Sequence, residues 1–352
     1  MPVLCDVPLA SRTTLGVGGP ARTLVEATSD AEAAAAVAAA DRRGTPVWVL
    51  GGGSNVVVAD AGFPGTVVAL ATRGIALRPK GGTVLVDVAA GEPWDAFVRW
   101  AVEEGLAGVE CLSGIPGTAG ATPIQNVGAY GREVADTLVS VRAFDRREAV
   151  LCTLPAAECG LGYRDSRFRS AEPDRYLVLG ITLRLRRGSP EPVRAGEVAG
   201  RLEGSSPTVA GVREAVLEVR RAKSMVVDPT DPETRSVGSF FVNPVVPADL
   251  LRTIRARAPE GAPPLPAWRA SGGLLRIPAA WLIEQAGFPR GLDRGAVGLS
   301  HRHALAIVNR GGASAGDVLA LAREVRDGVA AAFGVVLRPE PRFVGFAVDP
   351  LA

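Results

Sequence analysis

The sequence predicts a mixed α+β or α/β protein of two or three domains, and three observations lead to this prediction. The chain has 352 residues, more than a single hydrophobic core usually serves. Patterns typical of helices and of strands follow one another along it, which indicates several packed layers. Two segments, residues 50–56 and 114–131, separate these patterns and are too rich in glycine for the interior of a helix or strand.

The first elements are predicted near the N-terminus. Residues 30–44 are rich in alanine and predict a helix, with Asp30 as the N-cap and Gly44 as the residue that follows the last turn. Residues 46–50 are apolar and predict a buried strand. Because this strand runs directly into three consecutive glycines, we expect the first glycine-rich segment to lie at the carboxyl end of a strand.

The middle of the chain predicts a second unit of strands and a helix. Residues 83–89 are rich in β-branched side chains, which is typical of a strand. Residues 93–105 predict a helix that begins at a proline and ends at a glycine. Further strands are expected at residues 138–145 and 175–187. Apolar and polar residues alternate over residues 181–186, so we expect one face of that strand to be buried and the other to face water.

The C-terminal part predicts two more helices. Turn-rich segments at residues 229–235 and 261–266 delimit this part of the chain. Residues 278–287 predict a short helix. Residues 314–334 predict a longer one, with a capping box that starts at Ser314 and an apolar stripe that faces the core.

Composition excludes several classes of function. The formal net charge is +2, which gives no strong positive field, so we expect no nucleic-acid partner. The N-terminus lacks the basic and apolar parts of a signal peptide, and no apolar run approaches the roughly 20 residues that span a bilayer. The four cysteines include no Cys-x-x-Cys pair, and neither histidine lies near a cysteine in the sequence, so we expect reduced thiols and no metal site. These features predict a cytoplasmic protein.

The two glycine-rich segments are the first candidates for a binding site. Glycine lets main-chain N–H groups approach a ligand closely, and two such loops on one chain suggest a large ligand that carries phosphate. Neither segment matches the P-loop or the Gly-x-Gly-x-x-Gly fingerprint that opens a helix. The alternative is that both segments are tight surface turns. This alternative fits the longer segment less well, because long loops in compact domains are usually functional.

Three shorter segments carry side chains suited to chemistry. Arg164 lies beside a tyrosine, and an arginine can bind a carboxylate or phosphate through two parallel hydrogen bonds. Ser239 precedes two phenylalanines and can donate a proton in a dry site. Glu340 stands between two prolines, which fix the direction of its carboxylate. The alternatives are a surface turn with solvated arginines, a serine at a strand edge and a solvated salt bridge, respectively.

These segments, taken in order, resemble the UDP-N-acetylenolpyruvoylglucosamine reductase (MurB) family, flavoenzymes of peptidoglycan precursor synthesis. The resemblance extends from about residue 10 to residue 345. The matching stretches are Leu-Gly-Gly-Gly-Ser-Asn-Val at 50–56, Ile-Pro-Gly-Thr at 115–118, Gln-Asn-Val-Gly-Ala-Tyr-Gly at 125–131, Tyr-Arg-Asp-Ser-Arg-Phe at 163–168, Gly-Ser-Phe-Phe-Val-Asn-Pro at 238–244, Trp-Leu-Ile-Glu-Gln at 281–285 and Glu-Pro-Arg-Phe at 340–343.

The resemblance implies a fold, a cofactor and a reaction. The fold would be α+β, with an FAD-binding part of the type shared by p-cresol methylhydroxylase (PCMH) and vanillyl-alcohol oxidase. Its two α+β subdomains would be residues 1–75, completed by 340–352, and residues 76–225; a C-terminal α/β substrate-binding domain would be residues 226–339. The bound cofactor would be FAD and the co-substrate NADPH. The enzyme would convert UDP-N-acetylglucosamine enolpyruvate, a UDP-sugar, to UDP-N-acetylmuramate, as a monomer with no membrane or nucleic-acid partner.

The resemblance also implies roles for individual residues. Arg164 would hold the enolpyruvyl carboxylate, Glu340 would assist from the other side, and Ser239 would be the general acid. The residues that bind FAD would be Gly51, Gly52, Gly53, Ser54, Asn55, Ser113, Gly114, Ile115, Pro116, Gly117, Thr118, Gln125, Arg220 and Arg342. The residues that bind substrate would be Tyr130, Tyr163, Lys223, Asn243 and His303.

One departure from the family pattern lies in an insert at residues 192–198, which resembles the longer, type I subgroup. That subgroup often has a tyrosine before the glycine, closing over the UDP group, where this chain has Ala195. The alanine puts closure by a tyrosine in question, but not the reaction.

Two other functions stay open from the residues alone. An aldonolactone-type oxidase on the same FAD scaffold would not need Ser239 and Glu340 in these contexts. A non-catalytic flavoprotein that binds UDP-sugars would not need a proton donor.

Overall fold

The computed structural model describes residues 2–193, 196–204 and 206–351. The chain divides into two compact units. The first contains residues 1–7, 21–53 and 63–226, and the second contains residues 8–20, 54–62 and 227–352. The first glycine-rich segment, residues 50–56, is thus shared between the two units.

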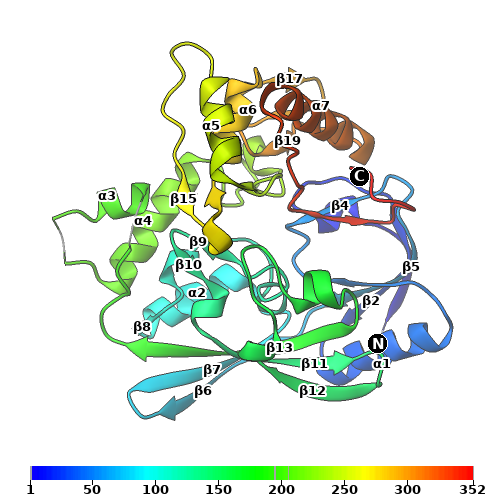
Figure 1. Ribbon diagram of the computed structural model, residues 1–352. Coiled ribbons are helices and arrows are strands. Elements are labelled where there is room, and N and C mark those ends of the chain that lie inside the picture. The colour runs from blue at the N-terminus through cyan, green and yellow to red at the C-terminus, as the bar shows by residue number, and fades with distance from the viewer. Residues whose placement is uncertain (1, 194–195, 205, 352) are drawn as a thin grey trace. The chain divides into compact units, whose positions relative to one another are not determined.

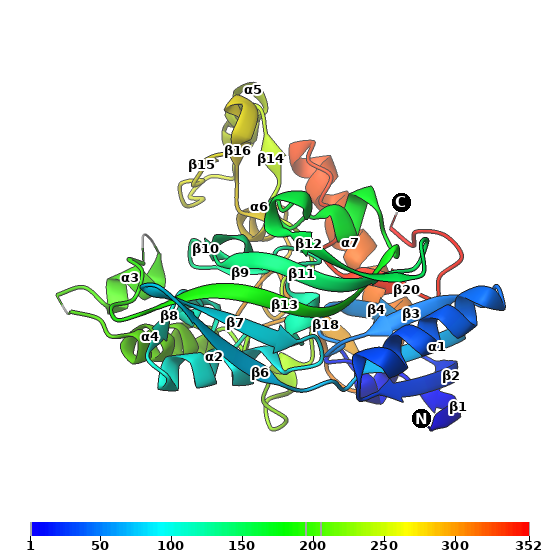
Figure 2. The same ribbon diagram turned by 90° about the horizontal axis from the view of Figure 1, so that it is seen from below.

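A mostly parallel sheet forms the N-terminal part of the first unit. Its strands, in the order in which they pair, are β1 (Val3–Pro8), β2 (Pro20–Ala27), β5 (Phe63–Leu70) and β3 (Val47–Leu50). Strand β5 pairs in parallel with both β2 and β3. Helix α1 (Asp30–Arg42) packs small side chains against this sheet, which is why its alanine-rich sequence suits the position. In Figure 2 this helix lies alongside β2 and β3.

A larger antiparallel sheet forms the rest of the first unit (Figure 1). Its strands, in pairing order, are β12 (Val150–Pro155), β11 (Leu138–Asp145), β13 (Tyr176–Arg187), β7 (Thr83–Ala89) and β6 (Ile75–Lys80), and β8 (Leu106–Ala107) pairs with the end of β13. Helix α2 (Trp94–Glu103) covers one face, with Trp94 and Phe97 fully buried. The remaining elements are β9 (Gly128–Ala129), β10 (Arg132–Glu133), α3 (Glu197–Arg201) and α4 (Val209–Ala222).

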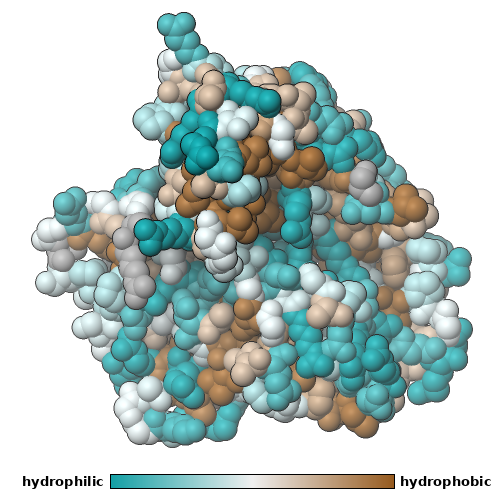
Figure 3. Space-filling view, viewed as in Figure 1, coloured by the Kyte–Doolittle hydropathy of each residue, from teal (hydrophilic) through white to brown (hydrophobic). Residues whose placement is uncertain are grey.

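The second unit is built around three helices and short strands. Its helices are α5 (Ala248–Ala256), α6 (Ala279–Gln285) and α7 (Ala315–Phe333). Its sheets are β14 (Val245–Val246), β16 (Leu275–Arg276) and β15 (Trp268–Arg269); β17 (Asp293–Arg294), β18 (Val297–Leu299) and β19 (Ile307–Asn309); and the parallel pair β4 (Val56–Val58) and β20 (Arg342–Val344). Exposed apolar side chains of this unit include Val245, Trp268 and Leu274, and Figure 3 shows apolar surface over the segment that holds β14, β15 and β16.

Most predicted elements are confirmed by the structure. The strands at 83–89 and 138–145 have the predicted bounds, and the alternation over 181–186 separates buried from exposed residues. Helix α7 has the predicted capping box at Ser314 and ends at Gly334 in the left-handed conformation. In the part of the chain that the structure describes, no helix has the length and apolar character needed to cross a membrane.

One predicted cap is wrong. Helix α1 begins one residue earlier than predicted, because Ser29 and not Asp30 is its N-cap. The Ser29 hydroxyl accepts a hydrogen bond from the Glu32 N–H at 3.2 Å, which satisfies one of the free donors of the first turn. Asp30 then lies inside the first turn, where its charge favours the positive end of the helix.

Candidate functional site

The two glycine-rich segments meet in the first unit. A Cβ atom at Gly52 would lie 2.5 Å from the Cα of Gly117, and one at Gly51 would lie 2.6 Å from the Oγ1 of Thr118. Both contacts are closer than real Cβ atoms allow, and Gly117 itself has a φ of +114°. The backbones of residues 51–53 and 117–118 therefore approach each other in a way that only glycine permits.

Both backbone polar groups of Gly114, the N–H and the carbonyl, are held by side chains. Its N–H donates to Oδ1 of Asp95 at 2.6 Å, and its carbonyl accepts from Nη2 of Arg220 at 3.2 Å. Asp95 is itself bound by Arg213, whose two terminal nitrogens donate hydrogen bonds to the two carboxylate oxygens at 2.6 and 3.0 Å. Burial opposes ionisation of Asp95, but the hydrogen bonds from Arg213 and Gly114 outweigh it and lower its pKa. The start of the second glycine loop is thus fixed by helices α2 and α4.

The other residues of this loop are also held in place. The Ser113 hydroxyl is fully buried and donates to the carbonyl of Glu110 at 2.6 Å. Ile115 is half-buried and packs against the apolar core of the unit, with Pro116 next to it. The carbonyl of Gly117 accepts from the N–H of Trp94 at 3.0 Å. The loop from Ser113 to Thr118 is therefore rigid before any ligand arrives.

Two buried polar atoms at this loop have no hydrogen-bond partner among the residues that the structure describes. They are the hydroxyl of Thr118 and the Nε of Arg220. An unpaired buried polar group is costly and rare in native proteins, so each needs an explanation. Both belong to the residues that the family resemblance assigns to FAD. Both suit a polar ligand bound where the backbones of residues 51–53 and 113–118 approach each other, an arrangement called the glycine cradle below.

Arg220 lies beside Tyr130 deep in the first unit. The Arg220 side chain is buried, and its Nη2 also donates to the carbonyl of Met225 at 2.7 Å. Burial lowers the pKa of Arg220, while the neighbouring Tyr130 hydroxyl acts in the opposite direction. Burial raises the pKa of Tyr130, which keeps its phenol neutral. Lys223 follows closely in sequence and its Nζ pairs with Oε1 of Glu197 at 2.7 Å.

Arg164 occupies the tip of a tight turn. The backbone N–H and C=O groups of Gly162 and Asp165 bond to each other at 2.9 and 3.2 Å. Arg164 has a φ of +54°, a conformation that costs a non-glycine residue roughly 1–2 kcal/mol. Such strain occurs often at functional sites, where the surroundings impose it. The Arg164 guanidinium lies 5.4 Å from the centre of the Tyr163 ring, and its Nη2 donates to the carbonyl of Gly128 at 2.7 Å.

The turn at Arg164 is fastened to the second glycine segment. Asn126 is buried and donates to the carbonyl of Gly162 at 2.9 Å, and the Ser166 hydroxyl donates to the carbonyl of Ile124 at 2.5 Å. Gln125, which the sequence placed at FAD, accepts a hydrogen bond from Nη1 of Arg169 at 3.1 Å. The Arg164 guanidinium and the glycine loop therefore form one rigid assembly.

Ser239 and Glu340 lie on adjacent backbone segments of the second unit. The carbonyl of Phe240 accepts from the N–H of Glu340 at 2.8 Å, and Phe241 pairs with Pro339 in an antiparallel bridge. Phe240 and Phe241 are fully buried and anchor this segment, which leaves Ser239 half-buried at its start. Two residues that are about 100 positions apart in the sequence are thus brought together.

Asn55 holds the segment that contains Glu340 and the first residue of strand β20, Arg342. Its carbonyl accepts from the N–H of Arg342 at 3.0 Å, and its Nδ2 donates to the carbonyl of Glu340 at 3.4 Å. Ser54, the residue before Asn55, begins the segment 54–62 of the second unit. The end of the first glycine segment therefore supports the C-terminal strand β20, and the side chain of Arg342 is exposed there.

Asn243 and His303, which the family resemblance assigns to the substrate, lie at the start of helix α6 and in the loop between β18 and β19. The Oδ1 of Asn243 accepts from the N–H of Ala279 at 2.9 Å, so this side chain caps helix α6. His303 is half-buried in the loop between β18 and β19, where its carbonyl accepts from the N–H of Ala306 at 3.0 Å. Ala195, where the family subgroup has a tyrosine, lies outside the described residues.

The sequence reasoning missed Asp95, Arg213 and Asn126 as supports of the site. Asp95 and Arg213 are 118 residues apart, and nothing in either local sequence indicates the pair. Asn126 was visible as part of the Gln-Asn-Val stretch. Its φ of +45° is a conformation that asparagine tolerates better than most residues, and this was the available signal.

Comparison with known proteins assigns this arrangement to a class. The FAD binding domain family matches residues 21–153, the part of the chain that contains the glycine cradle. The family described as UDP-N-acetylenolpyruvoylglucosamine reductase, C-terminal domain, matches residues 229–344, the part that contains Ser239 and Glu340. The chain is therefore an FAD-binding protein with a second domain typical of one reductase family.

Full-length relatives define the family. A UDP-N-acetylenolpyruvoylglucosamine reductase of Thermobifida fusca (strain YX) is 49% identical over 97% of this chain and 97% of its own. One of Cutibacterium acnes (strain DSM 16379 / KPA171202) is 50% identical over 97% of this chain and 90% of its own. The crystal structure of UDP-N-acetylenolpyruvylglucosamine reductase (MurB) from Thermus caldophilus has a TM-score of 0.67 at 26% identity, over 97% of this chain and 98% of that one. The chain belongs to the UDP-N-acetylenolpyruvoylglucosamine reductase family, as the sequence motifs indicated.

Proposed function

We propose that this protein reduces the enolpyruvyl group of UDP-N-acetylglucosamine enolpyruvate to give UDP-N-acetylmuramate, with NADPH as reductant and FAD as cofactor, in peptidoglycan precursor synthesis. The observation that carries this proposal is the match to named reductases along nearly the whole chain. The FAD binding domain match and the glycine cradle support the cofactor. The enolpyruvyl group is an alkene joined to a carboxylate, so its reduction needs a hydride donor, a group that binds the carboxylate and a proton donor.

The residues of the first unit fit FAD. The backbones at residues 51–53 and 113–118 approach without side chains in the way, so their amides can meet a pyrophosphate. The hydroxyl of Thr118 and the Nε of Arg220 are buried donors that the described residues leave unsatisfied, and a bound cofactor would satisfy them. Held by these residues, FAD would supply the hydride chemistry that links NADPH to the enolpyruvyl group.

Arg164 is suited to bind the carboxylate of the substrate. Negative charge builds up on that carboxylate as the alkene is reduced, and a fixed guanidinium stabilises such charge most in a site from which water is excluded. The hydrogen bond to Gly128 and the Tyr163 ring hold the plane of the guanidinium, so it does not need to reorganise during the reaction. An arginine can also bind both carboxylate oxygens at once, which a lysine cannot do.

Ser239 is suited to complete the reduction by protonating the carbon next to the carboxylate. A hydroxyl is a weak acid in water, so proton transfer from it requires a desolvated and precisely held side chain. The buried Phe240 and Phe241 supply both conditions. Glu340, on the adjacent segment, assists from the same unit. Arg342 is assigned to the flavin, and Tyr130, Tyr163, Lys223, Asn243 and His303 are assigned to the UDP-sugar substrate.

The proposal includes the setting in which the enzyme works. We place the reaction in the cytoplasm, which agrees with four free cysteines and with the supply of NADPH there. We propose a monomer as the active form. The division of the FAD-binding part into subdomains at residue 75, with residues 340–352 completing the first, stays a prediction.

Product analysis tests this proposal directly. Purified protein with FAD, NADPH and UDP-N-acetylglucosamine enolpyruvate is expected to consume NADPH and to form UDP-N-acetylmuramate, identified by mass spectrometry. The control omits the enolpyruvyl substrate and is expected to consume little NADPH. Rapid NADPH consumption that forms hydrogen peroxide and no UDP-N-acetylmuramate would indicate an oxidase instead.

A further inference from the structure

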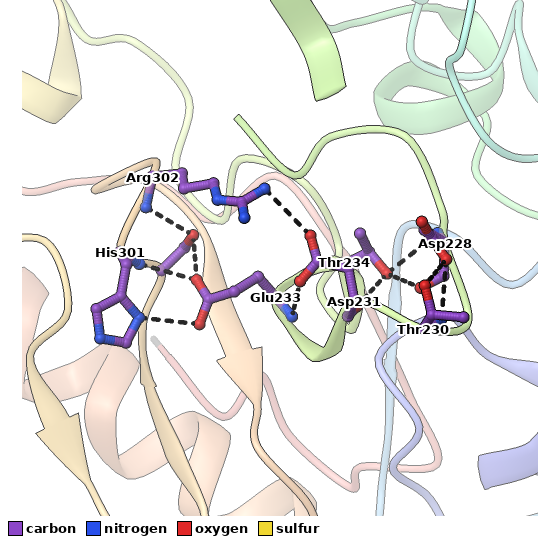
Figure 4. Close-up of polar contacts among 8 residues, drawn as sticks. Asp228, Thr230, Asp231, Glu233, Thr234, His301 and Arg302 are labelled. Carbon is purple, nitrogen blue, oxygen red and sulfur yellow. Dashed lines mark hydrogen bonds and ion pairs between the residues drawn. The ribbon is translucent and has the colours of Figure 1, made fainter. Parts of the chain in front are cut away.

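Glu233 lies in a polar network of the second unit that the reaction described above does not use (Figure 4). Its carboxylate accepts three hydrogen bonds from two consecutive residues. Oε2 accepts from the Ser300 hydroxyl at 2.6 Å and from the His301 N–H at 2.8 Å, and Oε1 lies 3.0 Å from Nδ1 of His301. The Ser300 side chain is fully buried and the Glu233 side chain is 16% exposed, so the carboxylate itself is largely shielded from water, whereas the His301 ring at its edge is exposed.

Asp231 extends the same network to the next residue. Its Oδ1 accepts from the N–H of Glu233 at 3.0 Å, and its Oδ2 accepts from Nη1 of Arg302 at 3.3 Å. The N–H of Arg302 in turn donates to the Ser300 hydroxyl at 3.2 Å. Two acidic side chains from one short turn therefore hold three consecutive residues, 300–302.

The turn that carries these acids is itself fixed. The Thr234 hydroxyl lies 2.8 Å from the carbonyls of both Asp228 and Asp231, and the N–H of Asp228 donates to that hydroxyl at 3.2 Å. Figure 4 shows Thr234 between Asp228 and Asp231, with Glu233 directed toward His301. The backbone of the turn that carries Glu233 is thus held by contacts of its own, in addition to those it makes with the loop.

The loop that Glu233 binds also supports Ser239. Residues 300–306 connect β18 to β19, and the N–H of Ser300 closes the loop on the carbonyl of Ala306 at 2.9 Å. At its other end, the carbonyl of Leu305 accepts from the N–H of Phe240 at 2.8 Å. Glu233 therefore holds one end of this loop and the residue next to Ser239 holds the other, with His303 between them.

We propose that Glu233 is a positioning residue for proton delivery: its carboxylate fixes the 300–306 loop, which carries His303, and the loop fixes the segment that presents Ser239. Glu233 itself need not touch substrate or cofactor. This inference rests on the proposed function, because it assigns Glu233 to the step in which Ser239 protonates the substrate carbon.

The chemistry of the contacts favours a carboxylate at this position. Oε2 receives two donors, the Ser300 hydroxyl and the His301 N–H, so an amide could bind only with its oxygen at this position and its nitrogen toward Nδ1 of His301, which would then have to accept in place of donating. Burial opposes ionisation of Glu233, but the hydrogen bonds from Ser300 and His301 outweigh it and lower its pKa. The loop is therefore bound by a charged acceptor near neutral pH, and hydrogen bonds to a charged acceptor are the stronger kind.

The test compares Glu233→Ala and Glu233→Gln with a matched control, Glu324→Ala. Glu324 is also a carboxylate of the second unit that binds a side chain, the fork of Arg294, but it lies on the outer surface of α7. In Glu233→Ala we expect flavin reoxidation by the enolpyruvyl substrate to fall about ten- to a hundredfold, since a displacement of about 1 Å costs that much in a positioned site. Reduction of the flavin by NADPH, which needs no proton on the substrate carbon, is expected to change less than about threefold. In Glu233→Gln the rate of flavin reoxidation is expected to lie between those of Glu233→Ala and the parent protein. In Glu324→Ala both rates are expected to match those of the parent protein.

A spectroscopic readout follows the loop without turnover. The chain has only two histidines, His301 and His303, so imidazole NMR signals of the flavin-loaded protein are readily assigned. Glu233→Ala is expected to shift the signals of both rings. The His301 ring loses its contact with the carboxylate, and the His303 ring moves with the loop. Glu324→Ala is expected to shift neither.

Each outcome decides the proposal. Reoxidation within about twofold of the parent rate in Glu233→Ala, or an unchanged His303 signal, would overturn it. Equal losses in both half-reactions would make Glu233 a general structural residue and would also overturn it; if the alanine variant does not fold, the glutamine variant decides by the same criteria. The parent protein runs both half-reactions first: its failure there would refute the proposed function, whereas the histidine signals would still report whether Glu233 positions the loop.

Discussion

The hydroxyl of Thr118 gives the sharpest prediction of the account, because it should affect the protein with and without FAD in opposite directions. Without cofactor, this buried hydroxyl has no partner among the described residues. Replacing it with the methyl group of valine, in Thr118→Val, removes an unsatisfied polar group that costs about 1–3 kcal/mol. We therefore expect the FAD-free protein to gain about 1 kcal/mol in its free energy of unfolding, which raises the Tm of a chain of 352 residues by about 1–2 °C.

With cofactor, the same change should weaken binding. If the hydroxyl pairs with FAD, the variant loses one hydrogen bond with a net value of about 1 kcal/mol. That loss raises the Kd for FAD about five- to tenfold, since 1.4 kcal/mol corresponds to a factor of ten. The assay is thermal unfolding of the protein stripped of flavin, followed by FAD titration with the quenching of flavin fluorescence as the signal.

Thr122→Val is the matched control. Thr122 is also a buried threonine of the second glycine segment, but its hydroxyl donates to the carbonyl of Ala119 at 2.8 Å. Its replacement is expected to destabilise the FAD-free protein by about 1 kcal/mol and to leave FAD affinity nearly unchanged. Thr118→Val that destabilises the FAD-free protein as much as Thr122→Val does, with unaltered FAD affinity, would refute the reasoning.

Three further predictions address other parts of the site. Ser239→Ala is expected to keep flavin reduction by NADPH and to slow reoxidation by the enolpyruvyl substrate about 10²- to 10⁴-fold; stopped-flow spectroscopy measures both steps, and equal losses would contradict the role of proton donor. Arg164→Lys is expected to lose most turnover despite its charge, because the two-pronged grip on a carboxylate is gone; near-normal steady-state turnover would remove Arg164 from the mechanism. Asp95→Asn is expected to weaken FAD binding in the same fluorescence titration, because Gly114 and Arg213 lose a charged acceptor; an unchanged Kd would show that the clamp does not shape the loop. The folded-state pKa of Asp95 is lowered, so its contribution to stability is present above the pKa of the unfolded chain and is lost as the pH falls through the folded pKa; the parent protein should therefore lose more Tm than Asp95→Asn on acidification.

Local sequence signals predicted much of the fold because they act over a few residues. The capping box at Ser314 and the stripe of α7 depend on spacings of three and four residues, and both are confirmed. The wrong cap on α1 came from the same kind of signal. Asp30 and Ser29 both cap helices well, and Glu32, three residues after Ser29, was the sign that favours Ser29.

The candidate site was predictable only as a set of motifs. Glycines at positions 51, 52 and 117 indicated a cradle, and the structure shows that their backbones meet. The supports of that cradle were not predictable, because Asp95 finds Arg213 and Glu233 finds Ser300 across long stretches of chain. The left-handed conformation of Arg164 had no signal either, since arginine carries no preference for it.

We expect a flavin bound to this protein to pass reducing power from NADPH to the enolpyruvyl substrate. The most direct measurement is an anaerobic titration of the purified protein followed in the visible flavin absorption band. We expect NADPH to bleach the band, and one equivalent of UDP-N-acetylglucosamine enolpyruvate to restore it. A protein that stays colourless after incubation with FAD, or a bleached flavin that only oxygen restores, would contradict the account.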